Sequence, residues 1–344
     1  MQKRITERGK LLNEKGELME AGYATELIRE YSRKDIKANP LRIKEWDYYL
    51  ISNNEHALAL TISDNSYMGL MSVSWIDFTA PSEKTMSEII LMPKGKTNLP
   101  STSISGDVSF HNRNLHMTFA NDGQKRHLTV NYKNFRDGKS LNADLVLFDV
   151  PRDSMVIATP YKEDKKAFYY NQKINCLRAQ GYVSIGNEGW QFAPDSAFAV
   201  LDWGRGVWTY SNTWYWSSLS AAVGGKRFGF NLGYGFGDTS AASENMVFVD
   251  GKAHKLSQVT FNIPLDENGK EEFMKPWTFT SDDQRVNLDF VPVIDRAALI
   301  DLKLVCSDQH QVFGRFSGTF ILDDGTPFTI KDLLGFAEKV SNKW

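Results

Sequence analysis

Cysteine is scarce in this chain of 344 residues, which contains only Cys176 and Cys306. Two thiols are too few for a disulfide framework or for a zinc site built from cysteines, so neither device can hold the fold together. Both residues stand in apolar, strand-like surroundings, where a free cysteine is usually a small buried hydrophobic side chain. We therefore expect both thiols to be buried rather than nucleophilic, in a reducing compartment.

An excess of charge of one sign is also missing, because 40 basic residues face 42 acidic ones and leave a net charge of −2. Nucleic acid is not expected as a partner, since phosphate binding draws on clustered lysine and arginine. No window reaches 18 uninterrupted apolar residues, and the polar opening MQKRITERGK lacks the apolar core of a secretion signal. We expect a cytoplasmic protein without a transmembrane segment.

Motifs for several kinds of chemistry are absent as well. The six histidines show neither an HxH nor an HExxH spacing, so no metal site is predicted. The chain contains no GxSxG motif, and its glycine-rich segment lacks both the lysine and the helix of a phosphate loop. We accordingly predict no cofactor. The sequence specifies neither a substrate nor an oligomeric state.

Aromatic residues, in contrast, are abundant: nine Trp, thirteen Tyr and twenty-one Phe make up 12% of the chain. From Lys44 onward, short segments rich in β-branched and aromatic residues alternate with turn signals, which is typical of antiparallel hairpins. Five of these signals are NDG at 121–123, RDG at 136–138, VDG at 249–251, ENG at 267–269 and DDG at 323–325. The pattern predicts an all-β fold.

The number of strands also predicts how the chain is divided. About twenty candidate strands exceed what one open twisted sheet usually holds, so we expect two lipocalin-like antiparallel β-barrel or sandwich units. We place an irregular leader at 1–40, a first β unit at 41–210 and a second at 211–344. The only helices predicted are one over 331–339, with an apolar stripe, and a short one around 24–31 in the leader.

Glycines at 229, 233, 235 and 237 share one parity in the segment GFNLGYGFGDTSAASEN. On a strand, this spacing leaves one face bare, so that a ligand, an aromatic ring or another backbone can approach closely. Asn231 would lie within the same bare patch as Gly233. Glu244 and Asn245 follow at the start of the next strand, where side-chain oxygens either cap turns or reach a ligand.

The segment from Asp202 to Trp216 carries a second pattern. Its even positions include Trp208, Asn212, Trp214 and Trp216, which on a strand would form an aromatic wall with one amide among the rings. Such a wall either lines a pocket for a flat apolar molecule, oriented by Asn212, or packs against the neighbouring unit.

Trp203 and Arg205, which follow Asp202 closely in the sequence, are further candidates for the ligand site. Arg205 lies two residues beyond Trp203, so it can pair with a carboxylate such as that of Asp202 or stack on the indole.

His310 is the best acid–base candidate in the sequence, because histidine titrates near neutral pH and shares strand parity with Gly314 and Gly318. Asp308 would assist it. The alternative is a histidine held by Asp308, or by a backbone carbonyl, for structural reasons.

Three long segments give the chain a family resemblance: FAVLDWGRGVWTYSNTWYW from residue 198, ENMVFVDGKAHKL from residue 244, and the closing stretch that begins SDQHQVFGRF at residue 307. With them, the chain resembles a bacterial family known as domain of unknown function 2804. More distantly, its layout is similar to the two-barrel lipocalin-like proteins that include carotenoid hydratases and hydroxyneurosporene synthase. The resemblance implies two β-barrels, but it implies neither an activity nor catalytic residues.

Together these patterns predict a protein that binds an apolar or amphiphilic small molecule in an aromatic-lined pocket. Acid–base chemistry of the hydratase, isomerase or cyclase type is one reading of that pocket. The alternatives are a non-catalytic carrier of a lipid-like ligand and an interaction protein without a pocket.

Overall fold

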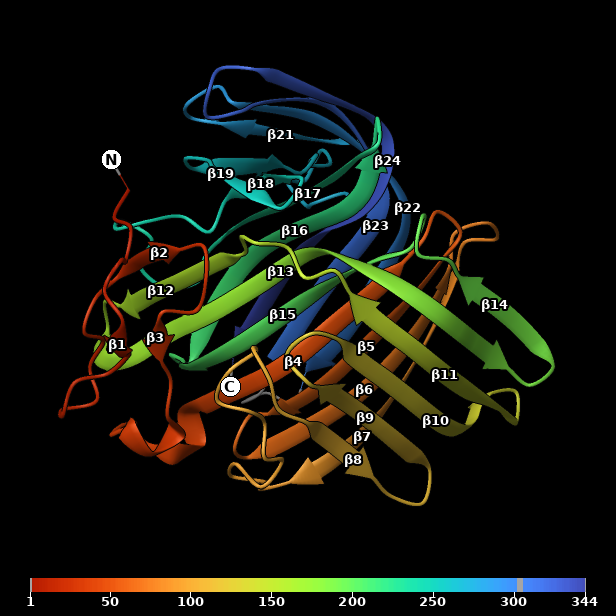
Figure 1. The fold of residues 1–344 in the computed structure, drawn as a ribbon, viewed down its shortest axis with the longest axis horizontal. Coiled ribbons are helices and arrows are strands. Elements are labelled where there is room, and N and C mark those ends of the chain that lie inside the picture. Colours follow the sequence, from red (N-terminus) through yellow and green to blue (C-terminus); the bar gives the residue numbers. More distant parts are fainter. Residues whose placement is uncertain (1, 302–305, 344) are drawn as a thin grey trace.

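The computed structural model describes residues 2–301 and 306–343 of the chain. Two curled antiparallel sheets, one of 13 strands and one of 9, make up nearly all of it. They pack against each other through the middle strands of each sheet (Figure 1). This arrangement confirms the predicted all-β class and is consistent with two lipocalin-like units.

The first sheet takes its strands from the leader and the first two-thirds of the chain. Its members are β2 (Gly22–Ala24), β4 (Ile43–Ser52), β5 (His56–Asp64), β6 (Met68–Asp77), β7 (Ser82–Leu91), β8 (Val108–His111), β9 (Leu115–Asn121), β10 (Arg126–Arg136), β11 (Lys139–Phe148), β12 (Met155–Tyr161), β13 (Asp164–Ile185), β14 (Glu188–Phe192) and β15 (Phe198–Val207). The main path runs β7-β6-β5-β4-β15-β13-β11-β10-β9-β8.

The second sheet follows in the order β19-β18-β17-β16-β24-β23-β22-β21-β20. Its members are β16 (Ser211–Val223), β17 (Lys226–Tyr234), β18 (Met246–Val249), β19 (Lys252–Lys255), β20 (Val259–Asn262), β21 (Trp277–Ser281), β22 (Val286–Asp301), β23 (Cys306–Ile321) and β24 (Pro327–Lys343). Two short strands, β1 (Gly9–Lys10) and β3 (Arg29–Glu30), pair separately, and two 3-10 turns, η1 (Arg33–Asp35) and η2 (Pro40–Arg42), precede β4. None of the described residues forms a helix long and apolar enough to cross a bilayer.

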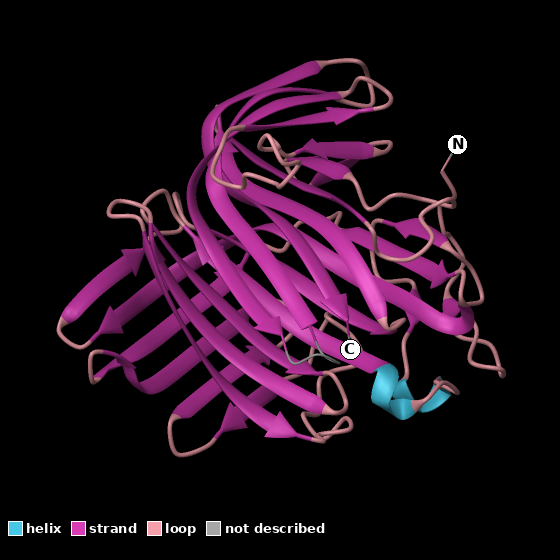
Figure 2. Ribbon diagram, turned by 180° about the vertical axis from the view of Figure 1, so that it is seen from behind, coloured by secondary structure: helices cyan, strands magenta, loops and turns pink. Residues whose placement is uncertain are grey.

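Burial follows the period of two expected for strands. In β9, buried and partly exposed residues alternate, because only one face of this strand meets a core. All ten residues of β15 are buried, because one face points into the first unit and the other points toward the second sheet. Strand β13 contacts β16 and β17, β15 contacts β16, and Tyr48 of β4 donates to Gln311 of β23 across the interface between the two curled sheets, which Figure 2 shows from behind.

The predicted C-terminal helix does not exist, because strand β24 occupies residues 327–343. Leu334 and Phe336 pack in the core of the first unit, whereas Ala337 packs in the core of the second, and Val340 is also buried. A strand buried on both faces carries a nearly continuous apolar run, and this run produced the false helical stripe.

Two other local expectations also need correction. The leader forms strands β2 and β3 rather than a helix around 24–31, and β2 extends the first sheet by pairing with β12. Strand β17 ends at Tyr234, so Gly235 and Gly237 lie beyond it with φ values of 93° and 74°, in the left-handed region that glycine permits. Only Gly229 and Gly233 keep the predicted parity on the strand.

Candidate functional site

Buried polar side chains gather where the two sheets face each other. Strand alternation places most of them, because every second residue of β13, β15, β16, β17 and β24 points into the interface, and Glu244 lies just before β18. We use the name interface cluster for the six members Asn171, Lys173, Asp202, Asn231, Glu244 and Glu338, all of which are almost completely buried.

Lys173 and Asp202 form the charged pair of the interface cluster. They are direct cross-strand neighbours on β13 and β15, and Lys173 Nζ lies 3.0 Å from Asp202 Oδ1. Asn171 Nδ2 donates to the same carboxylate oxygen at 2.6 Å. The ammonium also lies 4.2 Å from the ring centroid of Trp216. A buried cation is thus held between a carboxylate and an aromatic face.

Glu338 is held at both carboxyl oxygens. Trp214 Nε1 donates to Oε1 at 3.0 Å, and Gln311 Nε2 donates to Oε2 at 3.0 Å. Burial raises the pKa of Glu338 to about 7, although the Trp214 hydrogen bond and the nearby Arg296 and Lys173 lower it. The carboxyl is therefore fixed in place and titrates near neutral pH.

Glu244 is the less constrained carboxyl. Asn231 Nδ2 donates to its backbone oxygen at 2.9 Å and approaches Oε2 at 3.4 Å, whereas Oε1 has no hydrogen-bond partner within residues 2–301 and 306–343. This oxygen lies over Gly233, where a Cβ atom would meet it at 2.9 Å. Burial raises the pKa of Glu244 to about 7, Lys173 lowers it and Asp202 raises it further.

The bare face of β17 is therefore filled by side chains. A Cβ on Gly229 would lie 2.6 Å from Cys176 Sγ, which projects from β13, just as a Cβ on Gly233 would meet Glu244. The missing side chains of β17 let the two units approach closely and leave room for a carboxyl group.

Aromatic rings surround one end of the interface cluster. Trp208 lies outside the strands, between β15 and β16, and its ring centroid is 5.2 Å from that of Trp214 and 5.7 Å from that of Trp46. Phe236 stacks on Tyr169 with 4.7 Å between centroids and lies 5.8 Å from Trp214. The structure thus brings Trp208 and Trp214 of the predicted wall together with three rings that the sequence pattern did not reveal.

The predicted asparagines have different positions. Asn231 accepts from Trp216 Nε1 at 2.8 Å, and Asn245 Oδ1 accepts from the backbone N–H of Gly233 at 2.7 Å. Both orient the strand on which Glu244 rests. Asn212 instead bonds the backbone oxygen of Thr209 at 2.7 Å, so it closes a turn and does not point among the rings.

Trp203 and Arg205 project from the opposite face of β15, into the first unit. Arg205 is fully buried, pairs with Asp47 at 2.9 Å rather than with Asp202, and its guanidinium carbon lies 4.3 Å from the ring centroid of Trp203. These two residues do not belong to the interface cluster.

His310 also lies apart from the cluster, because it and Gln311 point to opposite faces of β23. Its Nδ1 is 2.6 Å from Asp295 Oδ2, its Nε2 is 3.5 Å from Asp308 Oδ1, and its ring stacks on Phe273 at 3.8 Å. The structure brings His310 and Asp308 together as predicted, but both ring nitrogens already face carboxylates. Within the described part of the chain, no three or more His, Cys, Asp or Glu side chains are placed so that they could hold a metal ion together.

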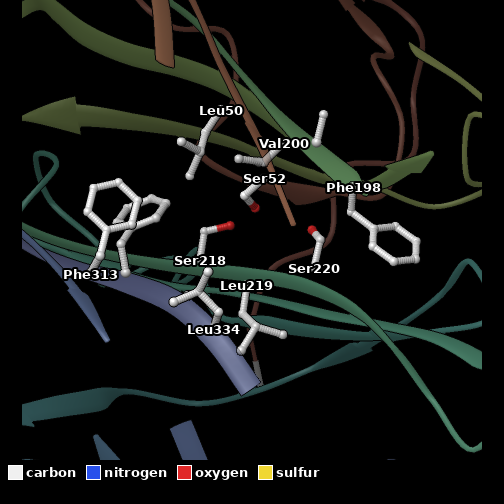
Figure 3. A pocket seen from close by; sticks show the side chains of 12 residues that line it. Leu50, Ser52, Phe198, Val200, Ser218, Leu219, Ser220, Phe313 and Leu334 are labelled. Atoms are coloured by element: carbon white, nitrogen blue, oxygen red, sulfur yellow. The ribbon is translucent and has the colours of Figure 1, made fainter. Parts of the chain in front are cut away.

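An open groove runs into the interface between the two sheets, where β4 and β16 end. It has a volume of about 150 Å³, and it narrows to an apolar chamber of about 20 Å³ that shares part of its lining (Figure 3). Leu50, Val200, Ser218 and Phe336 line the chamber. Because successive residues on one strand face are about 7 Å apart, the next row consists of Tyr48, Asp202, Trp216 and Glu338.

Lys173 and Glu338 were not predicted as site residues, although each carries a recognisable signal. Lys173 interrupts the strand-like run FYYNQKINCL, and Glu338 interrupts LLGFAEKV. A charge in the middle of a strand that is buried on both faces must find a partner, which marks it as a candidate.

The fold and the interface cluster together define an all-β protein of two curled, packed sheets with titratable groups buried between them. Residues 2–344 match the family described as domain of unknown function (DUF2804), so the chain belongs to this family, as its motifs suggested.

Solved structures with the same fold have little sequence in common with the chain. A protein assigned as AttH from Nitrosomonas europaea is similar with a TM-score of 0.53 and 10% identity, over 90% of this chain and 96% of that one. Kievitone hydratase from Nectria haematococca is similar with a TM-score of 0.51 and 10% identity, over 91% and 92%. A search of curated proteins finds no match. At these identities the likeness concerns the fold alone.

Proposed function

We propose that the protein binds an apolar or amphiphilic small molecule between its two units and transfers a proton to or from a carbon atom of that molecule. Hydration, dehydration and isomerisation are reactions of this kind. The observation that carries the proposal is the pair of buried glutamates, Glu244 and Glu338, each with a pKa of about 7. A catalytic acid or base works best when its pKa lies near the operating pH.

The two glutamates suit different tasks. Both oxygens of Glu338 accept hydrogen bonds, so this carboxyl is suited to orienting a ligand or stabilising charge. Glu244 keeps Oε1 without a partner among the described residues, so it can give a proton to the substrate or accept one from it. Besides the burial that raises the pKa of Glu244, Lys173 lowers this pKa and Asp202 raises it, so this ion pair would tune how readily Glu244 changes its protonation state.

Fold likeness adds limited support. One of the similar structures, kievitone hydratase, bears the name of a hydratase. The proposed reaction class for this chain rests on its own glutamates rather than on that name.

The test is solvent deuterium exchange into candidate ligands. Native mass spectrometry of the purified protein first captures co-purifying apolar molecules, and a panel of cyclic enones and phenolic ketones supplements them. In D₂O, the wild-type protein should introduce deuterium at carbon, and Glu244→Gln should lower the rate by roughly 10²–10⁴-fold, the contribution typical of general acid–base catalysis. Glu267→Gln, at an exposed turn, is the matched control. Exchange that survives in Glu244→Gln would exclude this glutamate as the acid–base group.

A carrier function is the second candidate, and one observation favours it. The chamber at the end of the groove is lined by apolar, glycine and serine residues without a titratable side chain. A ligand that is captured and retained without any carbon exchange in D₂O would support a carrier over an enzyme.

A further inference from the structure

Two arginines are buried inside the first unit, on the side of β15 that faces away from the interface cluster. Arg205 is completely buried and Arg126 is 2% exposed. Arg126 begins β10, whose alternate residues Leu128 and Val130 also point into this interior. Asp47 and Tyr49 face the same space from β4, because alternation places them on one face of this strand. Burial raises the pKa of the Tyr49 hydroxyl, whereas the side-chain hydrogen bond that Arg126 forms with this hydroxyl lowers it to a smaller extent.

Glu45 pairs with Arg33 and Asp47 pairs with Arg205, the latter at 2.9 Å, whereas Arg126 has no paired counterion among the described residues. Arg126 donates through Nη2 to the backbone oxygen of Ser103 at 2.9 Å, but within the described ranges no acidic side chain forms an ion pair with it and its Nε and Nη1 have no acceptor. A buried cation without a counterion is costly, and buried charges in proteins are normally paired. One negative charge beside Arg126 would give this guanidinium a counterion.

The other unmet groups nearby are also donors. Arg205 Nε and Trp203 Nε1 have no acceptor among the described residues, and the Arg205 guanidinium lies over the Trp203 ring. An interior with a surplus of donors is suited to an acceptor-rich ligand, whereas the orphan groups of a site for a cation would be acceptors.

The segment between β7 and β8 covers this interior. Its backbone oxygens at Pro100 and Ser103 accept from Arg205 Nη2 at 2.7 Å and from Arg126 Nη2 at 2.9 Å, respectively. Ser103 also donates to Gln172 and accepts from Asn121. The two guanidinium groups therefore help to hold the segment in place, and access to them requires that the segment move.

We infer that Arg126, supported by Arg205, binds the carboxylate of a small monocarboxylic acid with an apolar tail inside the first unit. The planar guanidinium fork matches the two oxygens of a carboxylate. A single uncompensated positive charge calls for a monoanion. The neighbouring walls are apolar and aromatic: Leu128 and Phe119 are buried, and the Phe119 ring lies 5.0 Å from that of Tyr49. This site is separate from the proposed proton-transfer site, because β15 lies between them.

The experiment measures binding of sodium hexanoate to the full chain by calorimetry and by thermal shift. Hexanol and sodium chloride at equal ionic strength are the comparison solutes. Hexanoate should bind and raise the melting temperature, whereas hexanol and chloride should not. Arg126→Met should weaken hexanoate binding roughly 10- to 150-fold, the range expected when a hydrogen bond to a charged group is lost. Arg152→Met, at a side chain that is 72% exposed, should leave the affinity unchanged.

Several results would overturn the inference. Equal stabilisation by chloride would mean a general anion effect, and an absence of hexanoate binding would mean that the donors bind only water. Unchanged binding in Arg126→Met would place hexanoate elsewhere, for example in the interface groove. Arg126→Lys keeps the charge without the fork and supplies the same comparison if the methionine variant does not fold. Glu244→Gln should retain hexanoate affinity, which separates this site from the proposed proton-transfer site.

Discussion

Replacing Glu244 by glutamine should change how stability depends on pH. The pKa of Glu244 rises from 4.5 to about 7 on folding, so the folded protein binds this proton more tightly than the unfolded chain does. Stability therefore falls as pH increases from about 4.5 to about 7, and it stays lower above that range. Each unit of pKa difference between the folded and unfolded states corresponds to about 1.4 kcal/mol, so the pKa difference of about 2.5 for Glu244 corresponds to roughly 3 kcal/mol of stability in total. Glu244 is only 2% exposed, so solvent screens little of this effect.

Urea denaturation at pH 5, 6, 7 and 8 measures the effect as the difference in unfolding free energy between wild type and Glu244→Gln. This difference should shift by roughly 2–3 kcal/mol in favour of the variant between pH 5 and 8, because a smaller part of the full effect already occurs below pH 5. A residual slope in the variant is expected, because Glu338 titrates in the same range. Glu267→Gln should give a curve parallel to that of wild type. Parallel curves for Glu244→Gln as well would refute the argument that burial raises this pKa.

Two further substitutions test the packing of the interface. Lys173→Met leaves the Asp202 carboxylate buried without its cation, so it should lower the unfolding free energy measured in urea by about 3–5 kcal/mol. Adding Asp202→Asn to this variant should recover part of the loss. If the double variant instead loses the sum of the two single losses, the two side chains do not stabilise each other. Gly204→Ala places a Cβ atom within the Trp46 ring, so we expect the unfolding free energy to fall by about 1–3 kcal/mol and the near-ultraviolet circular dichroism spectrum to change. An unchanged spectrum would mean that the Trp46 ring does not contact β15.

The fold class could be predicted because its signal is local. Turn sequences such as 136–138 and 323–325 join consecutive strands, and hairpins need only neighbouring residues to form. Local patterns failed where tertiary context decided the outcome. The run from Leu333 to Val340 has the spacing of a helical stripe, yet it forms a strand because both of its faces are buried.

The site was only partly predictable, because its members come from distant strands. Asn231, Gly233 and Glu244 belong to one short stretch, and the shared parity of Asn231 and Gly233 already suggested a common face. Lys173 and Glu338 are brought together by the packing of one sheet on the other, which no spacing along the chain encodes. For His310, its acid–base role stays a prediction, and the alternation of β23 directs it away from the glutamates.

Strand β15 explains why the two proposed sites can be studied separately. Asp202 and Trp203 are adjacent in sequence, but alternation sends the first toward the second sheet and the second into the first unit. The Asp202 carboxylate is neutralised by Lys173, and the Arg205 guanidinium is neutralised by Asp47, so each face of the strand carries its own counterion. Arg126 adds a positive charge on one face alone. An anion that neutralises it should therefore act on the interior of the first unit and leave the protonation of Glu244 nearly unchanged.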